Sequence, residues 1–116
     1  MTQKLTFDEK KAICERLAKY GPVFPPAFIN FFWTEFIFES TCGMFKPANK
    51  IHLRESDKLA ILDGAADDVI CHELYHAKQY AEQGWLKYSV RNLLRLNEPE
   101  AYAEQERVRR MIEEIK

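Results

Sequence analysis

Two of the three histidines in the chain lie four residues apart and enclose a glutamate. His72, Glu73 and His76 form the pattern His-Glu-x-x-His. In a helix each residue turns by about 100°, so the two imidazoles lie about 40° apart on one face and can converge on one ion. Glu73 lies on the flank of that face, where it can take a proton from a metal-bound water without being a ligand. The pattern therefore predicts a hydrolytic zinc site.

A catalytic zinc usually has three protein ligands, so one more donor is needed elsewhere in the chain. A histidine six residues after His76 would be one source, but position 82 is a glutamate and position 79 a glutamine. The C-terminal segment offers Glu100, which shares its helix face with Glu104 and with apolar residues. Those apolar residues are Val108, Met111 and Ile115. Two carboxylates thus face the core, where each needs a partner.

We predict that Zn²⁺ is bound by His72, His76 and Glu100, and that Glu104 accepts a hydrogen bond from a histidine N–H. A purely structural role competes for Glu100, because it stands three residues after Asn97, as in a capping box. Glu98 is a rival ligand, but it points about 160° away from Glu100 and off the apolar stripe.

The later motif resembles that of the gluzincin clan of metallopeptidases, including minimal soluble members and the catalytic core of the HtpX-type membrane peptidases. Residues 100–104, Glu-Ala-Tyr-Ala-Glu, are similar to the clan's Glu-x-x-Ala-Asp, with Glu in place of the final Asp. The resemblance covers roughly residues 43 to 105. It implies that a glutamate on a later helix is a zinc ligand. It also implies an edge strand that holds an extended substrate, for which Gly43, Met44 and Phe45 are the counterpart.

Composition limits both the architecture and the class of partner. With 116 residues the chain is long enough for one core, so we expect a single domain over residues 1–116. The net charge of −1 argues against a nucleic-acid partner. The charged N-terminus does not look like a secretory signal. The apolar stretch 23–33 is too short for a membrane span. We therefore expect a cytoplasmic protein whose three cysteines are reduced.

The expected elements form a small α+β domain. Helices are predicted at 6–19, at 63–83 with a stop at Gly84, at 85–96 and from Asn97 onward. Strands are predicted in the later half of 28–38, at 42–45 and at 51–53, the last two joined by a Lys-Pro-Ala-Asn-Lys turn. We expect a short antiparallel sheet packed on the helix of the His-Glu-x-x-His pattern and on a C-terminal helix that bears the glutamate, a zincin-like arrangement.

The function expected from these residues is a zinc metallopeptidase that hydrolyses peptide or protein substrates. One alternative is a latent zymogen or a non-catalytic zinc-binding interaction module, in which residues 22–26 or 113–116 fold over the metal. Another is a deformylase that uses Cys42, although the flanking sequence lacks that family's Gly-Cys-Leu-Ser. For the oxyanion donor, Tyr102 is excluded as outward-facing, and a surface role is favoured for both His52 and Tyr88.

Overall fold

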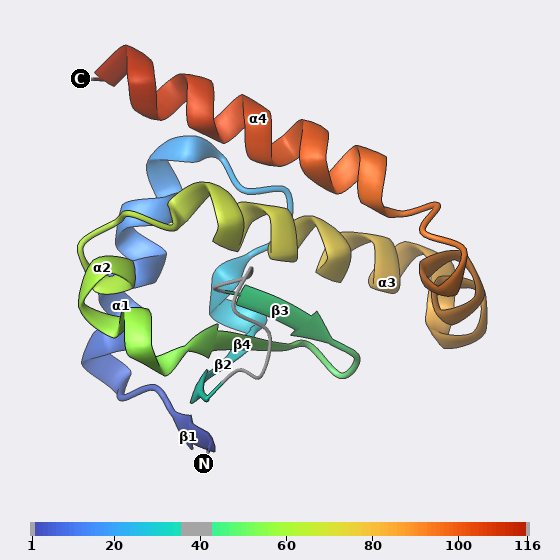
Figure 1. The fold of residues 1–116 in the computed structure, drawn as a ribbon, viewed down its shortest axis with the longest axis horizontal. Coiled ribbons are helices and arrows are strands. Elements are labelled where there is room, and N and C mark those ends of the chain that lie inside the picture. Colours follow the sequence, from blue (N-terminus) through green and yellow to red (C-terminus); the bar gives the residue numbers. More distant parts are fainter. Residues whose placement is uncertain (1, 36–42, 116) are drawn as a thin grey trace.

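A computed structural model of the chain describes residues 2–35 and 43–115. Within these residues, α-helices and a mixed four-stranded sheet form a small α+β fold (Figure 1). The strands are β1 (Thr2–Lys4), β2 (Asn30–Thr34), β3 (Gly43–Lys46) and β4 (Lys50–Arg54). The helices are α1 (Phe7–Leu17), α2 (Lys58–Leu62), α3 (Asp67–Leu93) and α4 (Glu98–Ile115), with short 3₁₀ turns at Ala18–Tyr20, Pro26–Phe28 and Glu55–Asp57.

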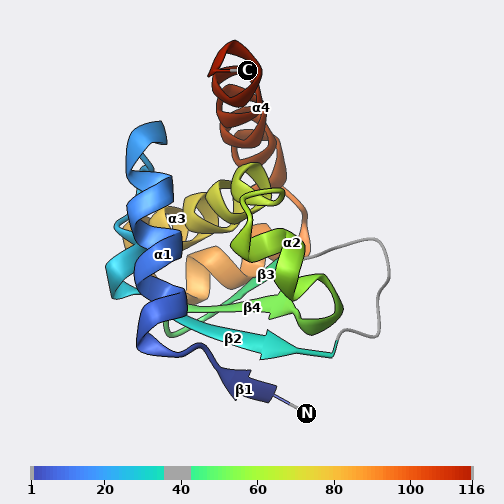
Figure 2. The same cartoon turned by 90° about the vertical axis from the view of Figure 1, so that its left-hand side faces the viewer.

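The strands lie in the order β1, β2, β4, β3 (Figure 2). The hairpin of β3 and β4 is antiparallel, as predicted, but β2 and β4 pair in parallel. The expectation of an antiparallel sheet is therefore wrong. The reason is that β3 lies on the outer side of β4, so that β2 meets the second strand of the hairpin, which runs in the same direction as β2. The sheet ends with β3 at one edge and β1 at the other.

One face of the sheet carries the core. Phe31 and Trp33 of β2 alternate with more exposed residues, as do Ile51 and Leu53 of β4, and all four are buried. Such a period of two is expected of strands with one covered face. A strand does form within 28–38, but it runs over Asn30–Thr34 and so begins in the earlier half rather than the predicted later half; residues 36–38 lie outside the described residues.

Helix α1 begins at a complete capping box. The Thr6 side chain accepts from the backbone N–H of Glu9, and the Glu9 carboxylate accepts from the N–H of Thr6. Ile13 and Leu17 point from this helix into the core. The prediction of a first helix over 6–19 is thus confirmed in its existence and nearly in its bounds.

Helix α3 lies between α4 and the sheet (Figure 1) and carries the His-Glu-x-x-His pattern. It begins at Asp67, four residues later than predicted. Gly84 interrupts it with φ 78° and ψ 166°, and helical turns resume up to Leu93 in a different direction. The expected stop at Gly84 and the short helix after it are both confirmed. None of the helices in residues 2–35 and 43–115 is long and apolar enough to cross a membrane.

Candidate metal centre

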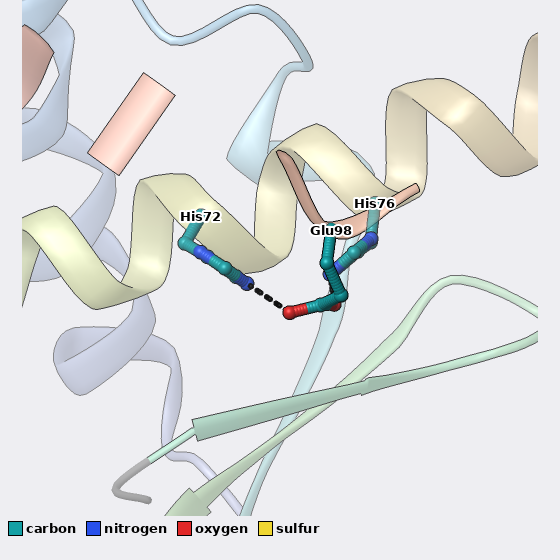
Figure 3. Close-up of side chains that lie close together, drawn as sticks. All are labelled: His72, His76 and Glu98. Carbon is teal, nitrogen blue, oxygen red and sulfur yellow. Dashed lines mark ion pairs between the residues drawn. The ribbon is translucent and has the colours of Figure 1, made fainter. Parts of the chain in front are cut away.

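Three possible metal ligands converge where the middle of α3 meets the start of α4. His72 and His76 from α3 and Glu98 from α4 offer ligand atoms that all lie within 4.8 Å of one another (Figure 3). The Glu98 carboxylate is 2.8 Å from Nε2 of His76 and 3.7 Å from Nε2 of His72. Both histidines are buried, and Glu98 is half-buried. The two predicted histidines are therefore brought together, with a different glutamate beside them.

Glu100 does not reach the histidines. Its carboxylate instead accepts a hydrogen bond of 3.0 Å from the Tyr75 hydroxyl on an exposed surface. Helix α4 begins at Glu98, and this first residue lies beside the histidines. The apolar face of α4 does not. The angular offset of about 160° between Glu98 and Glu100 then turns Glu100 away. A signal for Glu98 was present, because the sequence Glu98-Pro99-Glu100-Ala101 has the same Glu-x-x-Ala spacing as the motif read from Glu100.

Glu104 is buried on the apolar face of α4, as predicted, together with Ala101 and Val108. Its carboxylate accepts hydrogen bonds of 2.6 Å and 2.9 Å from the Arg107 guanidinium. The partner of this buried carboxylate is therefore an arginine one turn away, and not the histidine N–H that we expected.

Gln79 fixes the proton on His76. Its side-chain N–H₂ donates to the backbone carbonyl of Asn97 at 2.9 Å, and its Oε1 lies 2.8 Å from Nδ1 of His76. The Asn97 carbonyl can only accept, so the Gln79 atom facing it is the nitrogen and the atom facing His76 is the oxygen. Nδ1 of His76 must then carry the hydrogen. A neutral ring presents a lone pair on Nε2 toward Glu98.

This arrangement fits a bound cation. Without a second proton on the His76 ring, its Nε2 and the Glu98 carboxylate are both acceptors, yet they face each other at 2.8 Å. Two acceptors at this distance need a proton or a cation between them. Two imidazole nitrogens and one carboxylate oxygen form a donor set that suits zinc and leaves a fourth position open. The residues present therefore fit a catalytic zinc.

Glu73 lies beside the donor set and is held by strand β3. The backbone N–H of Phe45 donates to Oε1 of Glu73 at 2.8 Å, and Oε2 lies 3.9 Å from Nε2 of His72. Burial raises the pKa of Glu73 to about 8, and the charge of Glu98 acts in the same direction, against the Phe45 hydrogen bond. At such a pKa the carboxyl group is mostly protonated near neutral pH, and a cation held by the neighbouring donor set would favour the carboxylate form that a general base needs.

His72 has an aromatic neighbour that the helix-face argument excluded. The rings of His72 and Tyr102 meet edge to face with centroids 4.5 Å apart. Tyr102 is four residues after Glu98, so both lie on the same side of α4. The expectation that Tyr102 faces away from the site is therefore wrong, for the same reason as for Glu100. Burial lowers the pKa of His72, and the neighbouring His76 lowers it further.

A cavity of about 260 Å³ opens over these groups. Gly43, Met44 and Phe45 of β3 line one side of it, so the predicted substrate-binding strand does lie at the site. Tyr88, Asn92 and Tyr102 line other parts of the wall. The cavity therefore joins the donor set to an edge strand of the sheet.

Two other candidates lie apart from this cavity. His52 is on the opposite face of the sheet, stacked on Phe32 with ring centroids 5.1 Å apart, and its Nδ1 contacts the Thr34 hydroxyl at 2.8 Å. Cys71 is buried, and burial raises the pKa of its thiol to about 12, which favours the neutral form rather than a thiolate ligand. Cys42, on which the deformylase alternative depends, lies outside the described residues.

Comparisons of the sequence with protein-family models and with curated proteins found no match. A search of solved structures found none either. The function of this chain must therefore be inferred from its donor atoms and from the cavity around them.

Proposed function

We propose that the protein is a zinc-dependent metallopeptidase in which His72, His76 and Glu98 bind the metal and Glu73 is the general base. The observation that carries the proposal is the convergence of three ligand atoms within 4.8 Å beside a buried carboxyl group. Such a division between ligands and base is what zinc hydrolysis requires. The zincin-like arrangement and the likeness to gluzincins belong to the same proposal, with Glu98 in place of Glu100.

The chain's own residues supply the proton transfers. When bound, zinc lowers the pKa of water and polarises a carbonyl group. Glu73 takes the proton of the attacking water and returns it to the leaving amine. The Phe45 N–H holds one carboxylate oxygen of Glu73, which leaves the other directed toward His72. Burial raises the pKa of Tyr88 well above its ordinary value, so its hydroxyl stays protonated and is a candidate donor to the oxyanion.

Strand β3 supports a peptide as the substrate. It is an outer strand in the sheet order, and the cavity lies along its residues. The Phe45 N–H is taken by Glu73, so an extended peptide would add to this edge through its other main-chain groups. This geometry would place a scissile bond between β3 and the donor set. A peptide or protein segment in extended conformation is thus the substrate class that fits best.

The latent alternative depends on a segment that covers the metal. Among the described residues, neither 22–26 nor 113–115 lines the cavity. The position of these two segments therefore does not support a latent zymogen.

The decisive experiment compares the protein with its Glu73→Gln variant. Both should bind about one zinc per chain, measured by elemental analysis, because Glu73 is not a ligand. Only the parent should cleave members of a peptide library, and the variant should lose activity by at least about 100-fold.

Loss of zinc from the Glu73→Gln variant would make Glu73 a ligand and overturn its role. A parent protein that holds zinc in a His72- and His76-dependent manner but cleaves no peptide would favour the non-catalytic alternative.

A further inference from the structure

A run of large apolar side chains is exposed on the helical segment after Gly84. In residues 85–96, called here the 85–96 segment, Trp85 is 64% exposed and Leu93 is 83% exposed. The exposed apolar residues of the segment are Trp85, Leu86, Val90, Leu93, Leu94 and Leu96. Six such residues in twelve exceed the scattered apolar residues of an ordinary surface.

The apolar residues lie on the side of the helix that faces away from the protein. At 100° per residue, Trp85, Leu86, Val90 and Leu93 fall within an arc of about 140°. Tyr88 lies outside this arc, is buried and lines the cavity of the candidate metal centre. A surface helix normally buries its apolar side. In the 85–96 segment the more apolar side is instead exposed.

All charges of the 85–96 segment are positive. Lys87, Arg91 and Arg95 are its ionisable charged residues, and it contains no aspartate or glutamate. The chain as a whole has a net charge of −1, so this charge is concentrated locally. Exposed Trp and Leu side chains flanked by Lys and Arg are typical of helices that lie in the interface of an anionic membrane.

We propose that the 85–96 segment docks the protein onto the surface of a membrane that contains anionic lipids. The apolar arc enters the boundary between headgroups and acyl chains, and Lys87 and Arg95 contact lipid phosphates, whereas Arg91 is bonded to the Asn97 side chain. A second copy of this chain is a poorer occupant, because a two-fold contact would bring two sets of like charges together.

Docking would hold the cavity close to the bilayer. Tyr88 and Asn92 of the same helix line the cavity, so one short helix carries both the docking face and part of the cavity wall. This part rests on the proposed peptidase function. It implies that the substrates are peptides at the membrane surface, such as the juxtamembrane segments of membrane proteins.

The experiment is co-sedimentation with lipid vesicles, followed in parallel by tryptophan fluorescence. Trp33 is only 2% exposed, so a change of emission on adding vesicles reports on Trp85. We expect binding and a blue shift with vesicles of phosphatidylglycerol and phosphatidylcholine, and much weaker binding with phosphatidylcholine alone. Binding should weaken as salt is added, because salt screens the basic residues.

Two variants test the two halves of the interaction. Leu86→Ser with Leu93→Ser should lower vesicle affinity at least about tenfold, whereas Leu59→Ser, at a site 85% exposed on α2, should not. Lys87→Gln with Arg95→Gln should lower affinity by about 25-fold, at about fivefold for each charge. Lys11→Gln with Arg110→Gln removes the same charge elsewhere and should have a smaller effect. Thermal melting confirms that each variant is folded.

The proposal is overturned if the parent protein does not bind anionic vesicles, or if the segment variants bind as well as their controls. It is also overturned if sedimentation in the absence of lipid shows self-association that the Leu86 and Leu93 changes abolish, since the occupant is then a second copy. Vesicle binding needs no metal and is measured with a chelator present. Its failure would therefore leave the zinc peptidase proposal intact, and loss of peptidase activity would leave docking intact.

Discussion

Gln79 touches both sides of the candidate metal centre. Its side-chain oxygen lies against Nδ1 of His76, and its nitrogen donates to the carbonyl of Asn97, the residue before Glu98. One buried amide thus orients a ligand on α3 and fixes the backbone that carries a ligand on α4. Partners of this kind contribute to metal affinity without touching the metal.

We expect Gln79→Ala to weaken zinc binding by about 10–100-fold. The His76 ring would lose the acceptor that fixes its tautomer, and the Asn97 carbonyl would lose a donor. Titration against a competing chelator measures the change. Gln83→Ala is the matched control, because Gln83 donates to the side chain of Asn97 rather than to its backbone carbonyl. Equal affinities for the two variants would show that Gln79 does not position the ligand.

The two glutamates at the start of α4 are expected to differ sharply. Glu98→Gln replaces a charged oxygen of the donor set with a neutral amide and should reduce zinc affinity by at least about 100-fold. Glu100→Gln affects only the exposed contact with Tyr75 and should leave affinity within about twofold. The same chelator titration ranks the two variants. A larger loss for Glu100→Gln would restore the assignment made from the sequence.

The sequence pattern predicted which histidines meet but not which glutamate joins them. His72 and His76 are linked by the periodicity of a single helix, which local sequence determines. The choice between Glu98 and Glu100 depends on how α4 crosses α3 and on where its first turn lies. Helix periodicity correctly predicted that Glu104 and Val108 are buried, but Glu100 and Ile115 of the same predicted face are exposed. It could not show that the histidines lie against a different side.

At the scale of elements, Gly84 separates the ligand-bearing part of α3 from the 85–96 segment. Its φ of 78° and ψ of 166° lie in a region that is essentially restricted to glycine. This break turns the second part of the helix so that Tyr88 reaches the cavity. The conformation of Gly84 thus helps to place Tyr88 in the cavity wall.

Gly84→Ala should destabilise the protein by about 1–3 kcal/mol, as measured by urea denaturation. A Cβ at this position would meet no atom within 4 Å, so the cost comes from the backbone alone. Gly21→Ala is a suitable comparison, because its site is equally open but has φ 57° and ψ 59°, the left-handed region. The cost there should be lower, at about 1 kcal/mol. Equal costs would indicate that α3 can straighten at Gly84.

The sheet shows the limit of prediction at this scale. Bulky aromatic residues predicted a strand in the stretch that contains β2, although not its bounds, and the turn between β3 and β4 predicted their hairpin. β1 was missed because Thr2, Gln3 and Lys4 are all exposed and polar, so no apolar alternation marks them. The parallel pairing of β2 with β4 was missed because strand order depends on contacts between distant segments, which periodicity does not encode.

At the scale of the whole molecule, Arg16 joins the N-terminal helix to the helix of the metal centre. Its guanidinium bonds both oxygens of Asp67, the first residue of α3, at 2.8–2.9 Å. It also donates to the backbone carbonyls of Ile61 and Leu62 at the end of α2. Asp67 is buried. One side chain thus ties α1, α2 and α3 together at the end of α3 that precedes the histidines.

Removing Arg16 and removing Asp67 should lower the free energy of unfolding by different amounts. Arg16→Leu leaves a buried carboxylate and two carbonyls without their donor, and should destabilise the protein by about 3–5 kcal/mol. Asp67→Ala leaves Arg16 bonded to the two carbonyls and should cost less, within about 1–3 kcal/mol. Lys11→Ala, which removes an exposed pair with Glu15, should cost under about 1 kcal/mol.

Urea denaturation of the three variants measures this order, and the double variant Arg16→Leu with Asp67→Ala provides a further check. If the cost of Arg16→Leu comes from stranding a buried charge, then removing that charge as well should recover part of the stability, even though a second native residue has been lost. Additive losses in the double variant would instead mean that each side chain acts through its own packing. The contact of Arg16 on α1 with Asp67 on α3 would then stabilise the protein through packing rather than through the ion pair.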